Sequence, residues 1–245
     1  MPDLSEFINK PDPTLEAINF HIEMEQTAYT TKNIGFGVIG EPCSRKIWYN
    51  INIEEPEIFK AETLRIFRDG HRAEAYMAED LRRIKGIELY THDPNRGGKQ
   101  YKLDDLDGRF TGRLDGVIKG IIQAPKTFHT WEHKNVKDEK FDKLEKLKLK
   151  FGEKQALQNW NIIYYAQVQS NMKYSQLDRS YMTVSTPGLR RVTSVRTDFN
   201  KPYADALTDK ARRIIESKEP MTRISDNKES FDCKFCRWKD ICHEK

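Results

Sequence analysis

Changes in the hydrophobic period along the chain constrain its fold more than any other feature. Apolar residues recur at helical spacing from Glu62 to Lys85. Residues 86–136 instead show alternation, β-branched and aromatic residues and glycine turns, which predict three or four strands. A helical pattern returns from Lys137 to about Tyr174. Helices and strands are thus mixed along one chain, which indicates an α/β or α+β sheet protein.

The flanking segments extend this order. Two strands are predicted on either side of a Pro187-Gly188 turn, followed by a last helix from about Lys201 to Lys218. Residues 1–42 are predicted to form loops and a short helix. Because no stretch of the 245 residues resembles a linker, we expect one domain over residues 1–245, with a core at about 60–200.

Composition and the N-terminal segment indicate a broad class. The formal net charge is only +4, which does not by itself mark a nucleic-acid-binding protein. Lysines are concentrated in residues 137–154, where interleaved acidic residues allow either a phosphate-binding surface or a solvated helix. The N-terminal segment lacks the basic start and apolar run that are typical of a secretory signal, and no stretch approaches about 20 apolar residues. We therefore expect a soluble, cytoplasmic protein that does not associate with membranes.

Two acidic motifs suggest a metal site. If "TFHTWEHKNV" is a strand, Glu132 and Lys134 point to the same side, because side chains alternate with period two. Asp115 of "GRLDGVI" would meet Glu132 if the two segments pair as neighbouring strands. Adjacent carboxylates repel each other unless a divalent cation such as Mg²⁺ neutralises them. The simpler alternative is an Asp-Gly turn beside a solvated strand face.

Three further polar residues are candidates for the same site. Glu74 falls on the apolar stripe of the helix over 62–85, where an unpaired carboxylate is costly and needs a cationic partner. Gln167 lies on an apolar side of the later helical segment, where it could hold a nucleotide or a water. His71, about one turn before Glu74, is a candidate ligand or base, although such a histidine more often lies on a helix surface.

Cysteines are concentrated near the C-terminus. Cys233, Cys236 and Cys242 lie within ten residues, and the only other cysteine is Cys43. Thiols stay reduced inside cells, so metal ligation explains the grouping better than disulfides. Zn²⁺ held by the four cysteines, or by three of them with His243, is one alternative, and four free buried thiols are another.

In their order, the acidic motifs resemble the PD-(D/E)xK nuclease superfamily in its RecB-like branch. "GHRAE" (70–74) resembles the first motif, "GRLDG" the second and "EHK" the third, and "YYAQVQ" is similar to the glutamine helix of lambda-type phage exonucleases. Three positions depart from the family pattern. Leu114 replaces the proline before the second-motif aspartate, and Glu74 stands where the iron-sulfur branch commonly has histidine. Asn171 replaces the tyrosine of the Gln-x-x-x-Tyr motif.

The cysteine spacing resembles the iron-sulfur subfamily of that branch, which includes the CRISPR-associated exonucleases and the AddB-type recombination nucleases. The resemblance implies a 4Fe-4S cluster held by Cys43, Cys233, Cys236 and Cys242. Such a cluster would clasp the segments at about 40–50 and 230–245 together, in a structural role.

The resemblance also implies a fold and an activity. The fold would be restriction-endonuclease-like, with a mixed central sheet flanked by helices. The activity would be that of a Mg²⁺- or Mn²⁺-dependent deoxyribonuclease, most simply an exonuclease that hydrolyses phosphodiester bonds at DNA ends in recombination, phage replication or defence. The setting would be a bacterial or phage-infected cell, with a recombination or replication protein as a candidate partner. A noncatalytic DNA-binding or adaptor protein with the same fold is the alternative.

Each site residue has a role under this resemblance. Lys134 would position or deprotonate the attacking water, and Gln167 would orient that water or the scissile nucleotide. The metal ligands would be Glu74, Asp115, Glu132 and the backbone carbonyl of His133.

Overall fold

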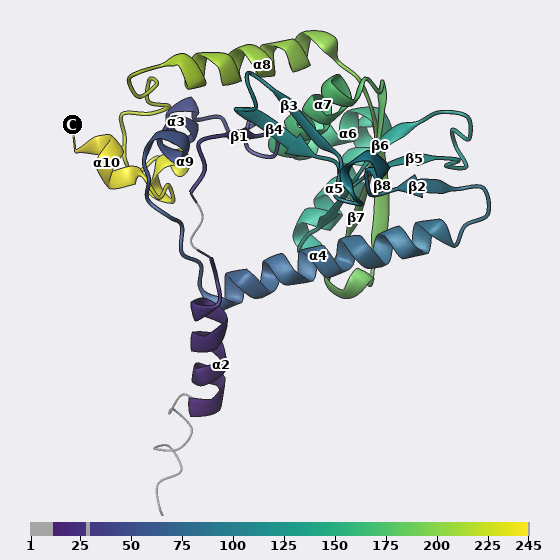
Figure 1. Ribbon diagram of the computed structural model, residues 1–245, viewed down its shortest axis with the longest axis horizontal. Helices are drawn as coiled ribbons and strands as arrows, with labels where there is room; N and C mark the ends of the chain where they lie inside the picture. Colours follow the sequence, from purple (N-terminus) through teal and green to yellow (C-terminus); the bar gives the residue numbers. More distant parts are fainter. Residues whose placement is uncertain (1–11, 28–29, 245) are drawn as a thin grey trace, which may run out of the picture.

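A five-stranded sheet forms the centre of the protein in the computed structural model, which describes residues 12–27 and 30–244 (Figure 1). The strand order is β2-β5-β6-β7-β8. The strands are β2 (Glu88–Tyr90), β5 (Gly116–Lys119), β6 (His129–Asn135), β7 (Arg179–Ser185) and β8 (Val192–Asp198). β6 and β7 run parallel, whereas the other neighbours are antiparallel. The sheet is therefore mixed, as predicted, and the parallel pair requires a long crossover.

Helices cover both faces of this sheet. The crossover between β6 and β7 consists of α5 (Asp138–Phe151), α6 (Glu153–Trp160) and α7 (Ile162–Ser175), which share a core with Met182 and Val184 of β7. The opposite face carries Trp131 and is covered by α4 (Ala61–Arg82) through residues that include Met77 and Leu81. Because side chains alternate along β6, Trp131 and Glu132 point to different faces.

A smaller sheet lies beside the first. It has the order β1-β4-β3, formed by β1 (Ile34–Gly35), β3 (Lys102–Asp105) and β4 (Phe110–Arg113). Phe110 packs in a second core with residues of α3 (Ser44–Asn52) and α8 (Lys201–Glu216). A Cβ atom at Gly112 would lie 2.2 Å from the ring of Phe36, so this close approach requires glycine.

The ends of the described chain differ in how they pack. The helix α2 (Pro13–Met24) projects from the body and is capped by Asp12, whose side chain accepts from Thr14 N–H. The C-terminal helices α9 (Phe231–Lys234) and α10 (Lys239–His243) lie beside α3. Trp238 Nε1 donates to Asn50 Oδ1 at 2.7 Å, which joins these distant segments. Two short 3-10 helices, η1 (Pro94–Arg96) and η2 (Pro187–Leu189), complete the elements.

The predicted elements agree with this order, with some corrections. The region 86–136 holds five strands, β2 to β6, rather than three or four, because several are only three or four residues long. The helical stretch 137–174 is divided by Gly152 and Asn161, which begin α6 and α7. The first part of the stripe on α4 is not core, since Phe67 is 45% exposed and packs on Phe59.

Two further predictions concern the N-terminal segment and membrane-spanning helices. The short helix expected within 1–42 is α2, whereas the part of that prediction on residues 1–11 lies outside the described residues. Among the described residues, no helix combines the length and apolarity required to cross a bilayer.

Candidate active site

Pairing of β5 with β6 brings the two acidic motifs together. Gly116 pairs with Trp131, so Asp115 lies at the start of β5 beside the middle of β6. The Asp115 carboxylate accepts a hydrogen bond from the backbone N–H of His133 at 2.9 Å. The segments are thus neighbours, as the sequence motifs required.

The Glu132 carboxylate is buried at the centre of a polar network. The residue is 1% exposed, so a solvated strand face, the simpler alternative, is wrong. Its Oε1 atom accepts from Lys134 Nζ at 2.7 Å and from Gln167 Nε2 at 2.8 Å. Its Oε2 atom accepts from Asn171 Nδ2 at 3.1 Å. Gln167 and Asn171 are four residues apart on α7 and therefore share the helix face that meets the sheet.

Lys134 remains a cation in this setting. Burial alone lowers its pKa, but the negative charges of Glu132 and Asp115 and the hydrogen bond to Glu132 outweigh burial and raise the pKa above its ordinary value. The ammonium also lies 5.2 Å from the centre of the Tyr164 ring, which favours the charged form. Lys134 is therefore suited to stabilise negative charge in its surroundings.

The carboxylates of Asp115, Glu74 and Glu132 repel one another. Burial raises the pKa of Asp115 well above its usual range, and the charges of Glu132 and Glu74 add to the effect. Burial likewise raises the pKa of Glu74, with Glu132 contributing and His71 opposing. Three carboxylates on α4, β5 and β6 therefore act on one another, and a bound cation would relieve their repulsion.

The donor set fits a magnesium or manganese ion that keeps some of its waters. Within residues 12–27 and 30–244, no three Asp, Glu, His or Cys side chains converge closely enough to hold a metal on their own. Mg²⁺, however, is usually bound by only one or two carboxylates, with waters and substrate phosphates as its other ligands. The backbone carbonyl of His133 stays a predicted ligand. The imidazole of His133 faces Thr183 and Ser185, and its pKa is lowered to about 4 by burial, so it is neutral.

Glu74 and Asp115 open into a pocket of about 490 Å³. Its walls also include His71 and three residues that the sequence motifs did not indicate: Arg82, Thr91 and His92. Glu132 and Lys134 do not line this pocket, because Glu132 faces Gln167 and Asn171 of α7. The pocket provides the space in which a substrate could approach the carboxylates.

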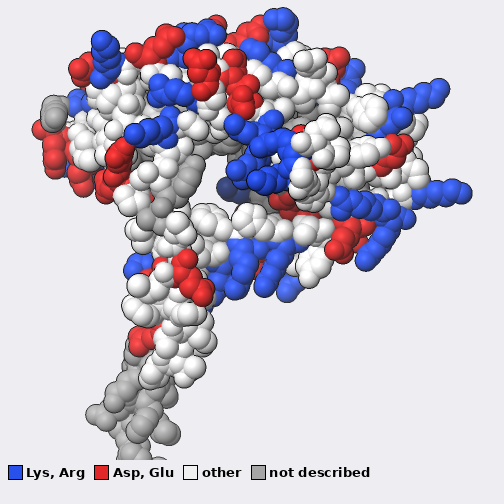
Figure 2. Space-filling model, in the orientation of Figure 1, with Lys and Arg blue, Asp and Glu red and all other residues white. Residues whose placement is uncertain are grey.

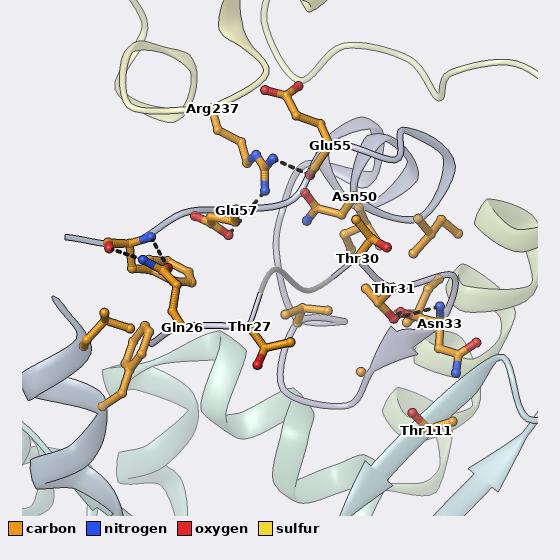
Figure 3. Close-up of a pocket in the computed structure, with 18 residues that line it drawn as sticks. Gln26, Thr27, Thr30, Thr31, Asn33, Asn50, Glu55, Glu57, Thr111 and Arg237 are labelled. Carbon is orange, nitrogen blue, oxygen red and sulfur yellow. Dashed lines mark hydrogen bonds and ion pairs between the residues drawn. The ribbon is translucent and has the colours of Figure 1, made fainter. Parts of the chain in front are cut away.

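A larger cavity lies elsewhere and holds none of the predicted catalytic residues. It measures about 620 Å³ and lies between the segment after α2, α3 and the α3–α4 connection (Figure 3). Its one arginine, Arg237, is already paired with Glu57 at 3.4 Å and donates to the carbonyl oxygen of Glu55 at 2.9 Å. We therefore place the candidate active site at the smaller pocket.

The four cysteines line one narrow pocket between α3 and the C-terminal helices. All four are free thiols, and burial raises the pKa of Cys236, with small contributions from Cys43 and Cys242. His243 lines the same pocket, where its Nε2 atom is buried and accepts or donates no hydrogen bond. The chain segments therefore meet as predicted, although the described thiols are not drawn together into a metal-holding group.

The sequence motifs do not identify Asn171 or Arg82 as residues of the site. Asn171 had only been identified as a departure from the family pattern, but its spacing of four from Gln167 indicates a shared helix face. Arg82 lies eight residues after Glu74 on α4, and only the tertiary packing of the β2–β3 connection brings it to the pocket.

The fold of this protein is similar to that of a known structure. No protein-family model and no curated protein matches this chain. A solved structure described as SSO0001 is similar over 94% of this chain and 96% of its own, with a TM-score of 0.52 and 12% identity. The two chains therefore share a fold along nearly their whole lengths.

Two other solved structures are exonucleases. An alkaline exonuclease (LHK-Exo) from Laribacter hongkongensis gives a TM-score of 0.47 at 12% identity, covering 75% of this chain and 86% of its own. A phage related exonuclease from Haemophilus somnus 129PT gives 0.48 at 12% identity, covering 77% and 93%.

Proposed function

We propose that this protein is a divalent-metal-dependent DNA nuclease that hydrolyses phosphodiester bonds, acting as an exonuclease on DNA ends. The observation that carries the proposal is the arrangement of Glu132, Asp115 and Lys134, with two carboxylates and one ammonium joined across two paired strands beside an open pocket. The PD-(D/E)xK assignment, in its RecB-like iron-sulfur branch, is part of this proposal and rests on the motifs.

The proposed roles follow from the chemistry of each group. Asp115 and Glu132, with Glu74, would hold Mg²⁺ or Mn²⁺, which supplies a Lewis acid at the scissile phosphate. Lys134 is charged, so it would position the attacking water and stabilise negative charge on the phosphate rather than remove a proton. Gln167 holds Glu132 in place through its amide N–H.

Basic side chains near the pocket support a polyanionic substrate. Figure 2 shows Lys and Arg side chains over the exposed side of α4 and along one side of the hollow between α4 and the smaller sheet. Arg68 and Arg72 of α4 are exposed, and Lys102 and Arg113 line a further pocket of about 400 Å³ on the smaller sheet. Such charges bind phosphates without regard to sequence. On α5 and α6, by contrast, Lys148 pairs with Glu145 and Lys154 with Asp198, which favours a structural role for part of that lysine-rich stretch.

The proposal is tested by digestion of end-labelled single- and double-stranded oligonucleotides. We expect shortened products with Mn²⁺ or Mg²⁺ and none with EDTA, because the carboxylates require a cation to work together. Products that form equally well in EDTA would contradict metal dependence. Binding without any cleavage would instead favour the noncatalytic DNA-binding alternative.

We further propose that Cys43 and the three C-terminal cysteines hold a 4Fe-4S cluster, with Zn²⁺ as the alternative. Their position around one pocket supports this proposal, and four thiolates are the usual ligands of such a cluster. Protein purified without oxygen is expected to be brown, with iron and sulfide at about four equivalents each. Colourless protein that contains one equivalent of zinc would favour the alternative, and metal-free protein would contradict both.

A further inference from the structure

The pocket at the carboxylates contains a positive charge that the proposed chemistry does not use. Arg82 lies on α4 two turns beyond Glu74, or about 12 Å along the helix axis at about 1.5 Å per residue. Both side chains line the same pocket. The Arg82 guanidinium is held at Thr91, which follows the end of β2, so it would meet a substrate phosphate other than the scissile one.

Arg82 is held in place by neutral groups. Its Nε atom donates to the Leu89 carbonyl oxygen at 3.4 Å, and its Nη2 atom donates to Thr91 Oγ1 at 2.6 Å. Glu79 lines the same pocket one turn earlier. Within the part of the chain that the structure describes, no carboxylate oxygen, including those of Glu79, lies within 4.0 Å of the Arg82 guanidinium. The neighbouring Arg83, by contrast, pairs with Asp80 at 2.9 Å.

Thr91 links Arg82 to the imidazole of His92. Its hydroxyl oxygen lies 2.8 Å from His92 Nδ1 while it accepts from Arg82. Because a hydroxyl oxygen can accept two hydrogen bonds or donate one, the tautomer of His92 decides which of the two groups donates. His92 lines the pocket as well. A guanidinium held by two hydrogen bonds beside an imidazole is chemistry suited to a phosphate oxygen.

We propose that Arg82, Thr91 and His92 form a phosphate subsite that holds the substrate backbone away from the scissile bond. This inference rests on the proposed nuclease function and adds a binding element to it. The subsite makes no contact with bases, so it contributes affinity and register but no sequence preference.

Binding in the absence of cleavage tests the subsite. The affinity of a fluorescent single-stranded oligonucleotide is measured by anisotropy for Lys134→Ala protein, alone or with Arg82→Ala, Arg82→Lys or Arg83→Ala. Arg82→Ala is expected to weaken binding about tenfold and to reduce the slope of log K against log salt by about 0.7, the value for one phosphate contact with a single strand. Arg82→Lys should recover part of the affinity. Arg83→Ala, which removes an equal charge one residue away, should change it less than about twofold.

Steady-state kinetics distinguish an effect of Arg82 on substrate binding from an effect on the cleavage step. In the otherwise unmodified protein, Arg82→Ala is expected to reduce kcat/KM for an oligonucleotide about tenfold more than kcat/KM for thymidine 5′-p-nitrophenyl phosphate, which has no second phosphate. Equal effects of Arg82→Ala and Arg83→Ala on oligonucleotide binding would overturn the subsite. If the unmodified protein hydrolyses neither substrate, the nuclease proposal fails, while the binding measurement still decides whether Arg82 contacts phosphate.

Discussion

Lys134→Ala protein is expected to lose cleavage by about 10³-fold while it still binds Mn²⁺. Among the described residues, the ammonium is the only cation that contacts Glu132, and a positioned group of this kind contributes about 10²- to 10⁴-fold to a reaction. The carboxylates that would hold the metal are unchanged by the substitution. Digestion of an end-labelled strand measures the activity, and the increase in melting temperature on addition of Mn²⁺ reports the binding of metal.

A matched control distinguishes this effect from loss of a surface charge. Lys143→Ala removes an exposed lysine from α5 and should cleave at close to the normal rate. Full activity of Lys134→Ala protein on single- and double-stranded ends would remove Lys134 from the site. Loss of the response to Mn²⁺ in the folded variant would instead indicate that the lysine supports metal binding.

Asp115→Asn protein is expected to be more stable than the parent without metal, yet inactive. The substitution removes a charge that Glu132 and Glu74 repel, whereas the asparagine oxygen still accepts from His133 N–H. We expect the free energy of unfolding to rise by about 1 kcal/mol and cleavage to fall at least about 10²-fold. Urea denaturation measures the free energy of unfolding of the parent and the variant, with and without Mn²⁺. We expect Mn²⁺ to stabilise the parent protein and to leave the stability of the variant unchanged.

The difference in stability between Asp115→Asn protein and the parent should depend on pH in one direction. The pKa of Asp115 is higher in the folded protein than in the unfolded chain, so the folded state binds its proton more tightly. The resulting stability is present below the unfolded pKa and is lost as the pH rises through the folded pKa. The stability advantage of Asp115→Asn should therefore grow as the pH rises above about 3.9, the ordinary pKa of an aspartate, and level off above the folded pKa. Asp104→Asn, on the exposed edge strand β3, is the control and should show no such growth. A variant less stable than the parent throughout would contradict the repulsion.

Period-two alternation made the carboxylate arrangement predictable from the sequence. Glu132 and Lys134 had to share a face if their segment was a strand, and Asp115 had to be near if the next strand paired with it. Gln167 was predictable as a polar residue on an apolar helix face. These are local patterns that involve one or two elements each.

Other features depended on packing that no local pattern encodes. Phe67 has the spacing of a core residue, but α4 extends past the sheet at that end, so Phe67 contacts Phe59 instead. Arg82 reaches the pocket only because Leu89 and Thr91 fold back onto α4. Such contacts depend on the path of the β2–β3 connection in three dimensions.

The parallel pairing of β6 with β7 determines when the site can assemble during synthesis. Glu132 lies on a strand whose partner, β7, follows only after the whole crossover of α5, α6 and α7. A growing chain that has left the ribosome only as far as β6 thus carries Glu132 and Lys134 beside β5, but without Asn171 and without β7. Non-local pairing of this kind forms slowly, so the buried surroundings of Glu132 are complete only after Ser185, the end of β7, has emerged.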